Sequence, residues 1–152
     1  MKLILVRHGE AGRDAATDEQ RTLTVRGQQQ AASTAQQVLA RHQPDLLVSS
    51  PLVRAQQTLL TFAALCPGVP VQQLDSIKPD DDAATALLDL MGLQGGCIVV
   101  VCHMDLIARL AALLLEDWPE AFALAEARVL ELPVVAAGLA VEQQRFWPRD
   151  TE

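Results

Sequence analysis

The sequence lacks long apolar runs and has few cysteines, and each shortage excludes a class of protein. Its first apolar stretch, Leu3–Val6, has four residues before Arg7 ends it, which is too short for a membrane span or for the core of a signal peptide. Three cysteines, an odd number, suit reduced thiols better than a disulfide framework. We therefore expect a cytoplasmic protein with no membrane partner.

Positive charge is also scarce. The 152 residues include 12 Lys and Arg against 19 Asp and Glu, which gives a net charge of −7. Because nucleic-acid binding generally requires a basic face, we expect no nucleic-acid partner. A small basic pocket within an acidic surface stays compatible with this balance. The length and the 50% hydrophobic content predict one folded domain over residues 1–152, which we take to be a monomer by default.

Several ligand-binding motifs are missing. Neither G-x-x-x-x-G-K-[ST] nor G-x-G-x-x-G occurs, which excludes the common nucleotide-binding fingerprints. Cys102 and Arg109 do not have the spacing of a cysteine-dependent phosphatase loop. Cys97, Cys102 and His103 lack a second cluster of ligands that would complete a zinc site. We expect both cysteines to lie in the core of a strand, and we expect no metal.

The sequence contains instead an alternation of apolar strands and amphipathic helices. Apolar runs predict strands at residues 3–6, 45–49, 69–74 and 97–102, and helical spacing predicts helices at 24–42, 52–65, 83–91 and 106–114. Thr24 is a candidate N-cap for the first helix. This order predicts an α/β fold, a three-layer sandwich with a mostly parallel central sheet flanked by helices.

The segment after Pro119 is less regular. Residues 129–135 and 138–146 predict two outer strands, which could form a hairpin. The aromatic side chains near this end are expected to pack in the core or at its rim; they are Trp118, Phe146 and Trp147. The sequence leaves the role of this segment open.

Polar side chains follow three of the predicted strands, at the point where each strand ends. Arg7 and His8 follow the first, residues 50–54 follow the second, and His103 follows the fourth. Because ligands bind outside the carboxyl ends of the strands in open α/β sheets, we expect these groups to converge on one crevice. Arg54 would lie in the first turn of a helix, where the helix dipole disfavours a cation unless an anion binds there.

The loop at residues 11–21 could add to this crevice. Arg13 and Arg21 could fold back over an anion. For the acidic residues of this loop, Asp14, Asp18 and Glu19, we prefer a solvated connector.

Two imidazoles and two guanidiniums around one crevice indicate phosphoryl transfer. Guanidiniums bind phosphate oxygens in a bidentate manner. A neutral histidine can attack phosphorus and form a covalent intermediate, and neighbouring cations lower its pKa in the required direction. A second histidine, if protonated, can stabilise the developing negative charge.

The same residues resemble the histidine phosphatase (phosphoglycerate mutase-like) superfamily. Arg7-His8-Gly9 matches its R-H-G signature, and residues 50–58, S-P-L-V-R-A-Q-Q-T, are similar to its S-P-x-x-R-A-x-Q-T segment. His103 matches the second histidine of the family, and residues 21–27 match a further stretch near the first helix. The short chain is most similar to the small bacterial branch, the SixA-type phosphohistidine phosphatases.

The resemblance implies a phosphoglycerate mutase-like fold and a role for each matching residue. His8 would be the nucleophile that becomes phosphorylated. Arg7, Arg54 and His103 would form the phosphate pocket, with Arg21 as a further binding residue. No metal or organic cofactor is implied.

Two positions depart from the family pattern. Asp105 follows Met104 where the family more often has proline or asparagine, and a carboxylate there could repel a phosphate or pair with an arginine. Larger phosphomonoesterases of the superfamily carry a carboxylate general acid after the third strand. Here Asp75, Asp80, Asp81 and Asp82 lie nearby in the sequence, without a recognisable acid motif.

The missing acid motif favours one substrate class. A phosphate ester expels an alkoxide, which benefits from a proton donor. Phosphohistidine expels imidazole, whose conjugate acid has a pKa of about 6.5 and can leave already protonated. We therefore expect a phosphohistidine phosphatase that acts on a histidine-phosphorylated protein, a phosphotransfer domain or a phosphocarrier. Two alternatives stay open: a small-molecule phosphomonoesterase with an acid from Asp75 to Asp82, and a non-catalytic phosphoprotein-binding module.

Overall fold

A six-stranded sheet forms the middle layer of the protein in a computed structural model, which describes residues 1–149. The order across the sheet is β3-β2-β4-β1-β5-β6. The strands are β1 (Lys2–Arg7), β2 (Leu46–Ser49), β3 (Val71–Gln73), β4 (Cys97–Cys102), β5 (Ala127–Glu131) and β6 (Val141–Phe146). β1, β2, β3 and β4 pair in parallel, whereas β5 runs antiparallel to both β1 and β6. The sheet is therefore mostly parallel, as predicted.

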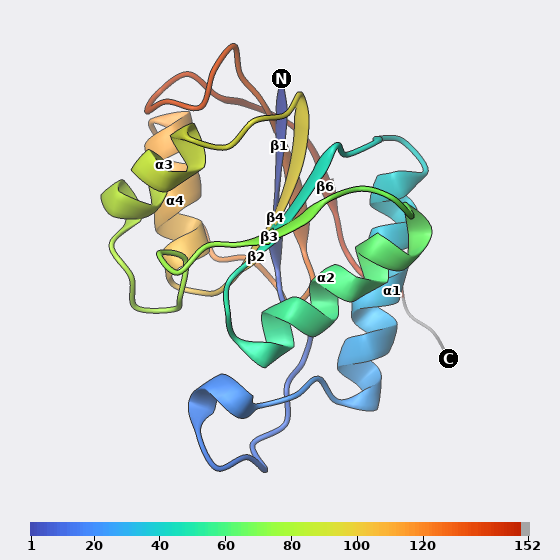
Figure 1. Ribbon diagram of the computed structural model, residues 1–152. Helices are drawn as coiled ribbons and strands as arrows, with labels where there is room; N and C mark the ends of the chain where they lie inside the picture. The colour runs from blue at the N-terminus through green and yellow to red at the C-terminus, as the bar shows by residue number, and fades with distance from the viewer. Residues whose placement is uncertain (150–152) are drawn as a thin grey trace.

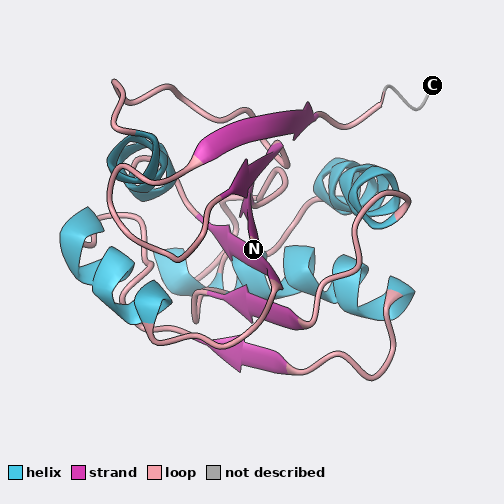
Figure 2. Ribbon diagram, turned by 90° about the horizontal axis from the view of Figure 1, so that it is seen from above, coloured by secondary structure: helices cyan, strands magenta, loops and turns pink. Residues whose placement is uncertain are grey.

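Two pairs of helices cover the two faces of the sheet (Figures 1 and 2). The helices are α1 (Val25–Leu39), α2 (Val53–Leu65), α3 (Ala83–Met91) and α4 (Leu106–Leu115), with a short 3-10 helix η1 (Asp18–Gln20) before α1. α1 and α2 lie on one face, and α3 and α4 lie on the other. This arrangement confirms the predicted three-layer sandwich. Thr24 caps α1 as predicted, because its side chain accepts a hydrogen bond from the Gly27 N–H.

The central strand β1 shows why its sequence is apolar throughout. Leu3 and Leu5 pack in the cluster under α3 and α4. Ile4 and Val6 point the other way and pack in the cluster under α1 and α2. A strand with a helix layer on each face buries both sets of alternating side chains. β1 thus anchors both cores and carries Arg7 to the sheet edge.

The C-terminal strands form the predicted antiparallel pair, with different ends. β5 begins at Ala127, two residues earlier than predicted, and stops at Glu131. β5 lies inside the sheet between β1 and β6, so of these two strands β6 alone lies at an edge of the sheet. The pairing to β1 explains the difference, because Ala127 lies opposite Val6 and extends the ladder toward the carboxyl edge.

The aromatic residues near the C-terminus differ from one another. Phe146 is buried as predicted. The prediction for Trp118 is wrong, since this side chain is 88% exposed. Phe122, which is buried, provides the apolar anchor of the loop after α4 in its place. Trp147 is half-exposed at the end of the described chain.

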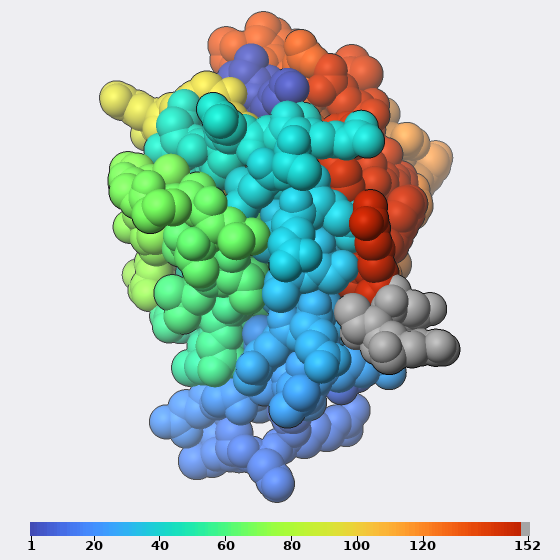
Figure 3. Space-filling model, turned by 90° about the vertical axis from the view of Figure 1, so that its right-hand side faces the viewer, coloured from blue at the N-terminus to red at the C-terminus, as the bar shows by residue number. Residues whose placement is uncertain are grey.

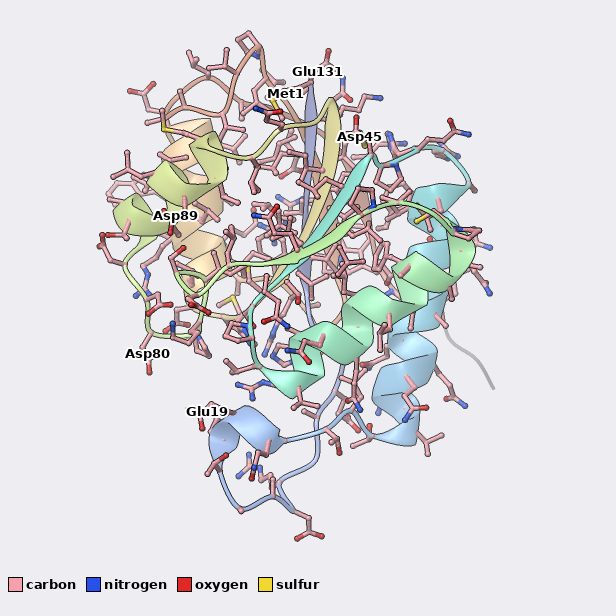
Figure 4. The ribbon with its side chains drawn as sticks, viewed as in Figure 1. Met1, Glu19, Asp45, Asp80, Asp89 and Glu131 are labelled. Atoms are coloured by element: carbon pink, nitrogen blue, oxygen red, sulfur yellow. The ribbon has the colours of Figure 1, made fainter. Side chains whose placement is uncertain are left out.

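The carboxyl ends of β1, β2 and β4 meet at the lower edge of the sheet in Figure 1, and the segment with η1 lies beneath them. In the space-filling view this segment, in medium blue, forms the lower end of the molecule (Figure 3). Met1, Asp45 and Glu131 lie at the opposite end (Figure 4). Within residues 1–149, no helix has the length and apolar character needed to cross a membrane.

Candidate active site

The end of β1 places His8 with a defined tautomer. Its Nδ1 lies 2.7 Å from the Gly9 carbonyl oxygen. Because a carbonyl oxygen can only accept, Nδ1 carries the proton and Nε2 keeps its lone pair. The backbone fixes the ring further, since the His8 N–H donates to the Cys102 carbonyl on β4. His8 thus presents an unprotonated nitrogen from a buried position.

Arg54 lies in the first turn of α2 and is buried, with 4% exposure. Its Nη2 lies 3.1 Å from Asp18 Oδ2, and its Nη1 donates to the Asp18 carbonyl oxygen. Arg21 binds the other carboxylate oxygen of Asp18 at 3.0 Å. The Asp18 side chain is 54% exposed, as expected for a solvated connector, and it also binds two guanidiniums of the site, a role that the sequence did not predict. Asp14 and Glu19 are exposed as expected.

His103 lies at the end of β4 and is 1% exposed. Its Nε2 is 2.6 Å from Ser50 Oγ, which comes from the end of the neighbouring strand β2. The His103 and His8 rings are 5.1 Å apart between centroids. The parallel pairing of β1, β2 and β4 brings both histidines and Ser50 to one point.

Arg7 is held by a loop that the sequence did not connect with the site. Its Nη1 donates to the Phe122 carbonyl oxygen at 2.8 Å. Phe122 belongs to residues 116–126, here called the 116–126 loop. A second residue of this loop, Ala125, donates its backbone N–H to the His8 carbonyl oxygen. Both contacts use backbone atoms of the loop, which leave no pattern in the side chains. This loop is the part of the open segment after Pro119 that reaches the site.

Two side chains of the motif at residues 50–58 tie the surrounding loops to α2. Thr58 Oγ1 accepts a hydrogen bond from the Gly9 N–H, and Gln57 Oε1 accepts one from the Leu23 N–H. One helix therefore carries Arg54 and also fixes the turn after His8 and the end of the η1 segment. The motif is a positioning device as well as a source of one arginine.

Gly9 and Gly27 pack directly against each other. A Cβ on Gly9 would lie 2.5 Å from the Gly27 carbonyl oxygen, and a Cβ on Gly27 would overlap the Glu10 carbonyl oxygen. Both are backbone atoms that cannot swing aside, so any side chain would push the turn after His8 away from α1.

A cavity of about 360 Å³ opens between these elements. It is lined by all five predicted site residues, Arg7, His8, Arg21, Arg54 and His103, and also by Glu10, Ala11, Arg13, Asp18, Pro79, Met104 and Leu124. Four guanidiniums and two imidazoles therefore face one space. No group of three or more His, Cys, Asp or Glu side chains suited to hold a metal ion occurs within residues 1–149.

The carboxylates considered as general acids lie elsewhere. None of the residues Asp75, Asp80, Asp81 and Asp82 lines the cavity; Pro79 is the only residue of that stretch that does. Asp81 pairs with Lys78, and Asp82 caps α3. Figure 4 shows Asp80 on the outside of the loop before α3. Asp105 is exposed and does not line the cavity either. Its negative charge partly offsets the lowering of the Arg7 pKa that burial causes.

Burial and positive charge make both histidines neutral at pH 7. Burial lowers the pKa of His8 to about 4; the hydrogen bond to Gly9 opposes this shift, and Arg54 and Arg7 add to it. Burial also lowers the pKa of His103 to about 2, with further contributions from His8 and Arg54. His8 is therefore ready to attack. His103 acts as a neutral donor in the open cavity, and the protonated form considered from the sequence would require the charge of a bound anion.

The cysteines lie where the sequence predicted. Cys102 is fully buried in the core, and burial raises the pKa of its thiol to about 12. Cys97 packs against the other core cluster and is half-buried. Neither side chain lines the cavity.

The sequence matches a known protein family over its N-terminal half. Residues 3–78, roughly half of the chain, match the model of the histidine phosphatase superfamily (branch 1). The chain belongs to the histidine phosphatase superfamily. Phosphate hydrolysis is thus its class of reaction. The sequence matches no curated protein.

Two solved structures illustrate the range of proteins that share this fold. The chain is similar to the protein histidine phosphatase SixA complexed with tungstate, with 24% identity, 97% of each chain covered and a TM-score of 0.89. It is also similar to phosphoserine phosphatase from Entamoeba histolytica in complex with 3-phosphoglyceric acid, with 24% identity, 95% of each chain covered and a TM-score of 0.70. At this level of identity the two structures establish the fold and leave the substrate open.

Proposed function

We propose that the protein is a phosphohistidine phosphatase, which removes phosphate from a histidine-phosphorylated protein through a covalent phospho-His8 intermediate. The observation that carries the proposal is the neutral His8 with a free Nε2, set among guanidiniums in one cavity. The partner would be a phosphotransfer domain or a phosphocarrier.

The proposed reaction has two displacement steps. In the first, His8 Nε2 forms a bond to phosphorus while the bond from phosphorus to the substrate imidazole breaks. The guanidiniums of Arg7 and Arg54, with Arg21 at the rim, bind the phosphoryl oxygens, and His103 donates a hydrogen bond to one of them. In the second step, the oxygen of water forms a bond to phosphorus while the bond from phosphorus to His8 Nε2 breaks. The inorganic phosphate that leaves carries the protons of the water, and neutral His8 is regenerated.

The shortage of proton donors in the cavity supports a P–N bond as the target. Only two carboxylates line the cavity. Hydrogen bonds from Arg21 and Arg54 lower the pKa of Asp18, so it stays a carboxylate at neutral pH. Glu10 Oε1 accepts a hydrogen bond from Thr24 Oγ1. A leaving imidazole needs less help from an acid than a leaving alkoxide does.

The two rival functions are less well supported. A small-molecule phosphomonoesterase with an acid from Asp75 to Asp82 would need one of these carboxylates at the cavity, and they lie outside it. A binding module disabled by Asp105 would need that carboxylate to block the anion site. The side chain is exposed, and within residues 1–149 it forms no salt bridge with Arg7.

A comparison of two substrates tests the proposal. The purified protein would be given a phosphocarrier phosphorylated on histidine and, separately, glycerol phosphate, an ester whose alkoxide leaving group benefits from a proton donor. We expect fast loss of phosphohistidine and slow ester hydrolysis, with both abolished in His8→Ala. His42→Gln serves as the matched control, because His42 is a buried histidine outside the cavity and should leave the rates unchanged. Faster ester hydrolysis, or turnover retained by His8→Ala, would overturn the proposal.

A further inference from the structure

Ser50 is buried in contact with the His103 ring, at a point fixed by the sheet. It follows β2 directly, and its N–H donates to the Val101 carbonyl on β4. Its Oγ lies 2.6 Å from His103 Nε2. Ser50 has no exposed surface and His103 has 1%. This contact is therefore a short hydrogen bond with no competition from solvent.

The other contacts of Ser50 indicate which group donates. The Leu52 N–H donates to Ser50 Oγ at 3.2 Å. If the His103 Nε2–H also donated to Oγ, the hydroxyl proton would lose its acceptor in a fully buried place. His103 Nδ1 has no hydrogen-bond partner either, so it would be left as a second unsatisfied group. If Ser50 donates to Nε2, the hydroxyl is satisfied and only the Nδ1–H remains unused.

We propose that Ser50 is a positioning residue that holds His103 in the tautomer with its proton on Nδ1, so that this N–H donates to a phosphoryl oxygen in the cavity. The proposal rests on the proposed function for the identity of the ligand. His103 lines the cavity, and Nδ1 is its only ring nitrogen without a partner.

The tautomer has a direct chemical consequence because His103 is neutral in the open cavity. A neutral imidazole has one N–H and one lone pair. With the proton on Nδ1, the ring attracts the phosphoryl oxygen. With the proton on Nε2, the lone pair of Nδ1 would face that oxygen and repel it. The Ser50 hydroxyl, which does not contact the substrate, would thereby determine whether His103 attracts or repels the phosphoryl oxygen.

Ser49 provides a matched control for testing Ser50. It is the neighbouring buried serine, and its Oγ donates to the Ser50 carbonyl oxygen, away from the histidine ring. Replacing Ser49 by Ala removes a buried hydroxyl from the same strand end without touching His103. Ser50→Ala removes the donor, and Ser50→Thr restores a hydroxyl.

The test combines kinetics with nitrogen NMR. We expect Ser50→Ala to lower kcat on phosphohistidine by about 10- to 100-fold, the range typical of groups that orient a catalytic ligand, with a much smaller change in KM. Ser49→Ala should stay within about twofold of the wild type, and Ser50→Thr should recover part of the rate. In ¹⁵N spectra of the phosphate-free protein at pH 7, where His103 is neutral, the protonated ring nitrogen of His103 should be Nδ1, and Ser50→Ala should populate the other tautomer.

Two results would overturn the assignment: a proton on Nε2 in the phosphate-free wild type, or equal losses in Ser50→Ala and Ser49→Ala. Failure of the proposed function gives a different result. In that case the wild type would not hydrolyse phosphohistidine, while the tautomer of His103 in the phosphate-free protein would still decide the role of Ser50.

Discussion

Arg128 and the arginines at the cavity differ in how their guanidinium nitrogens are paired. Arg128 is 2% exposed, and each of its three nitrogens has a partner: Nε binds Glu126 at 2.6 Å, and the two Nη atoms donate to the Glu120 and Ala121 carbonyls. The guanidinium also lies 3.7 Å from the centre of the Phe122 ring. Arg7 and Arg54, at the cavity, each keep a buried Nε without a partner. Burial of an arginine thus does not by itself indicate a functional site. An unpaired guanidinium nitrogen in a residue that lines a cavity is the better indication.

The largest expected effect separates Arg54 from Arg128 by activity. Arg54→Ala should lower kcat/KM on phosphohistidine by about 10²- to 10³-fold, because it removes a guanidinium from the cavity in which the proposed reaction places the phosphoryl group. The free energy of unfolding should change by less than about 1 kcal/mol, since the partner it leaves, Asp18, is half-exposed. Steady-state kinetics and urea denaturation measure both quantities. The control is Arg41→Ala, because Arg41 is exposed and does not line the cavity. An unchanged kcat/KM in Arg54→Ala would show that Arg54 has no more part in the reaction than Arg128 has.

Arg128 should respond in the opposite way. Arg128→Met should lower the free energy of unfolding by about 3 kcal/mol, because the buried Glu126 would lose its partner at 2.6 Å and keep only Arg145, whose Nη1 lies 3.9 Å away. The double variant Arg128→Met with Glu126→Leu should recover much of this loss, since it removes the pair as a whole. Urea denaturation gives the free energy of unfolding of the wild type, the single variant and the double variant. A single variant as stable as the wild type would show that Arg128 is not structural.

Inorganic phosphate provides a third test. At 100 times its Kd, a ligand that binds only the folded state stabilises it by about 2.7 kcal/mol. We expect this increment in the wild type and in Arg128→Met, and its loss in Arg54→Ala. Urea midpoints at pH 7 with and without phosphate measure it. Equal stabilisation of Arg54→Ala would mean that phosphate binds outside the cavity.

The smallest expected effect concerns pH. The pKa of His8 is about 4 in the folded protein against an ordinary value of 6.5. Between these values the unfolded chain binds a proton that the folded protein does not, so stability falls as the pH is lowered from about 6.5 toward 4. The slope due to one histidine is up to about 1.4 kcal/mol per pH unit. Urea denaturation at pH 7, 6 and 5 should give a shallower slope for His8→Gln than for the wild type, and identical slopes would contradict the assigned pKa.

The parts of the site that follow regular elements were predictable from the sequence. Apolar runs located the ends of β1 and β4, and parallel pairing brought His8 and His103 together without further information. Arg54 was found because a cation in the first turn of a helix needs an explanation, which a facing cavity provides.

The parts that could not be predicted lie in irregular segments. Asp18 comes from a polar loop without a period, so nothing indicated that it meets Arg54 across a distance in the chain. The Phe122 and Ala125 contacts use backbone atoms, and any side chain could stand at those positions. The exposure of Trp118 depended on which aromatic residue of the 116–126 loop reaches the core.

The contact between Gly9 and Gly27 gives a practical rule for sorting relatives of this chain. Glycine inside a helix costs about 1 kcal/mol relative to alanine, yet Gly27 lies in the first turn of α1, where a methyl group would strike the Glu10 carbonyl. A natural sequence with R-H-G and both histidines but a larger residue at the position of Gly27 should therefore be sorted with the inactive paralogues. The residue type at this one position, outside the R-H-G signature, would thus identify an inactive protein from its sequence alone.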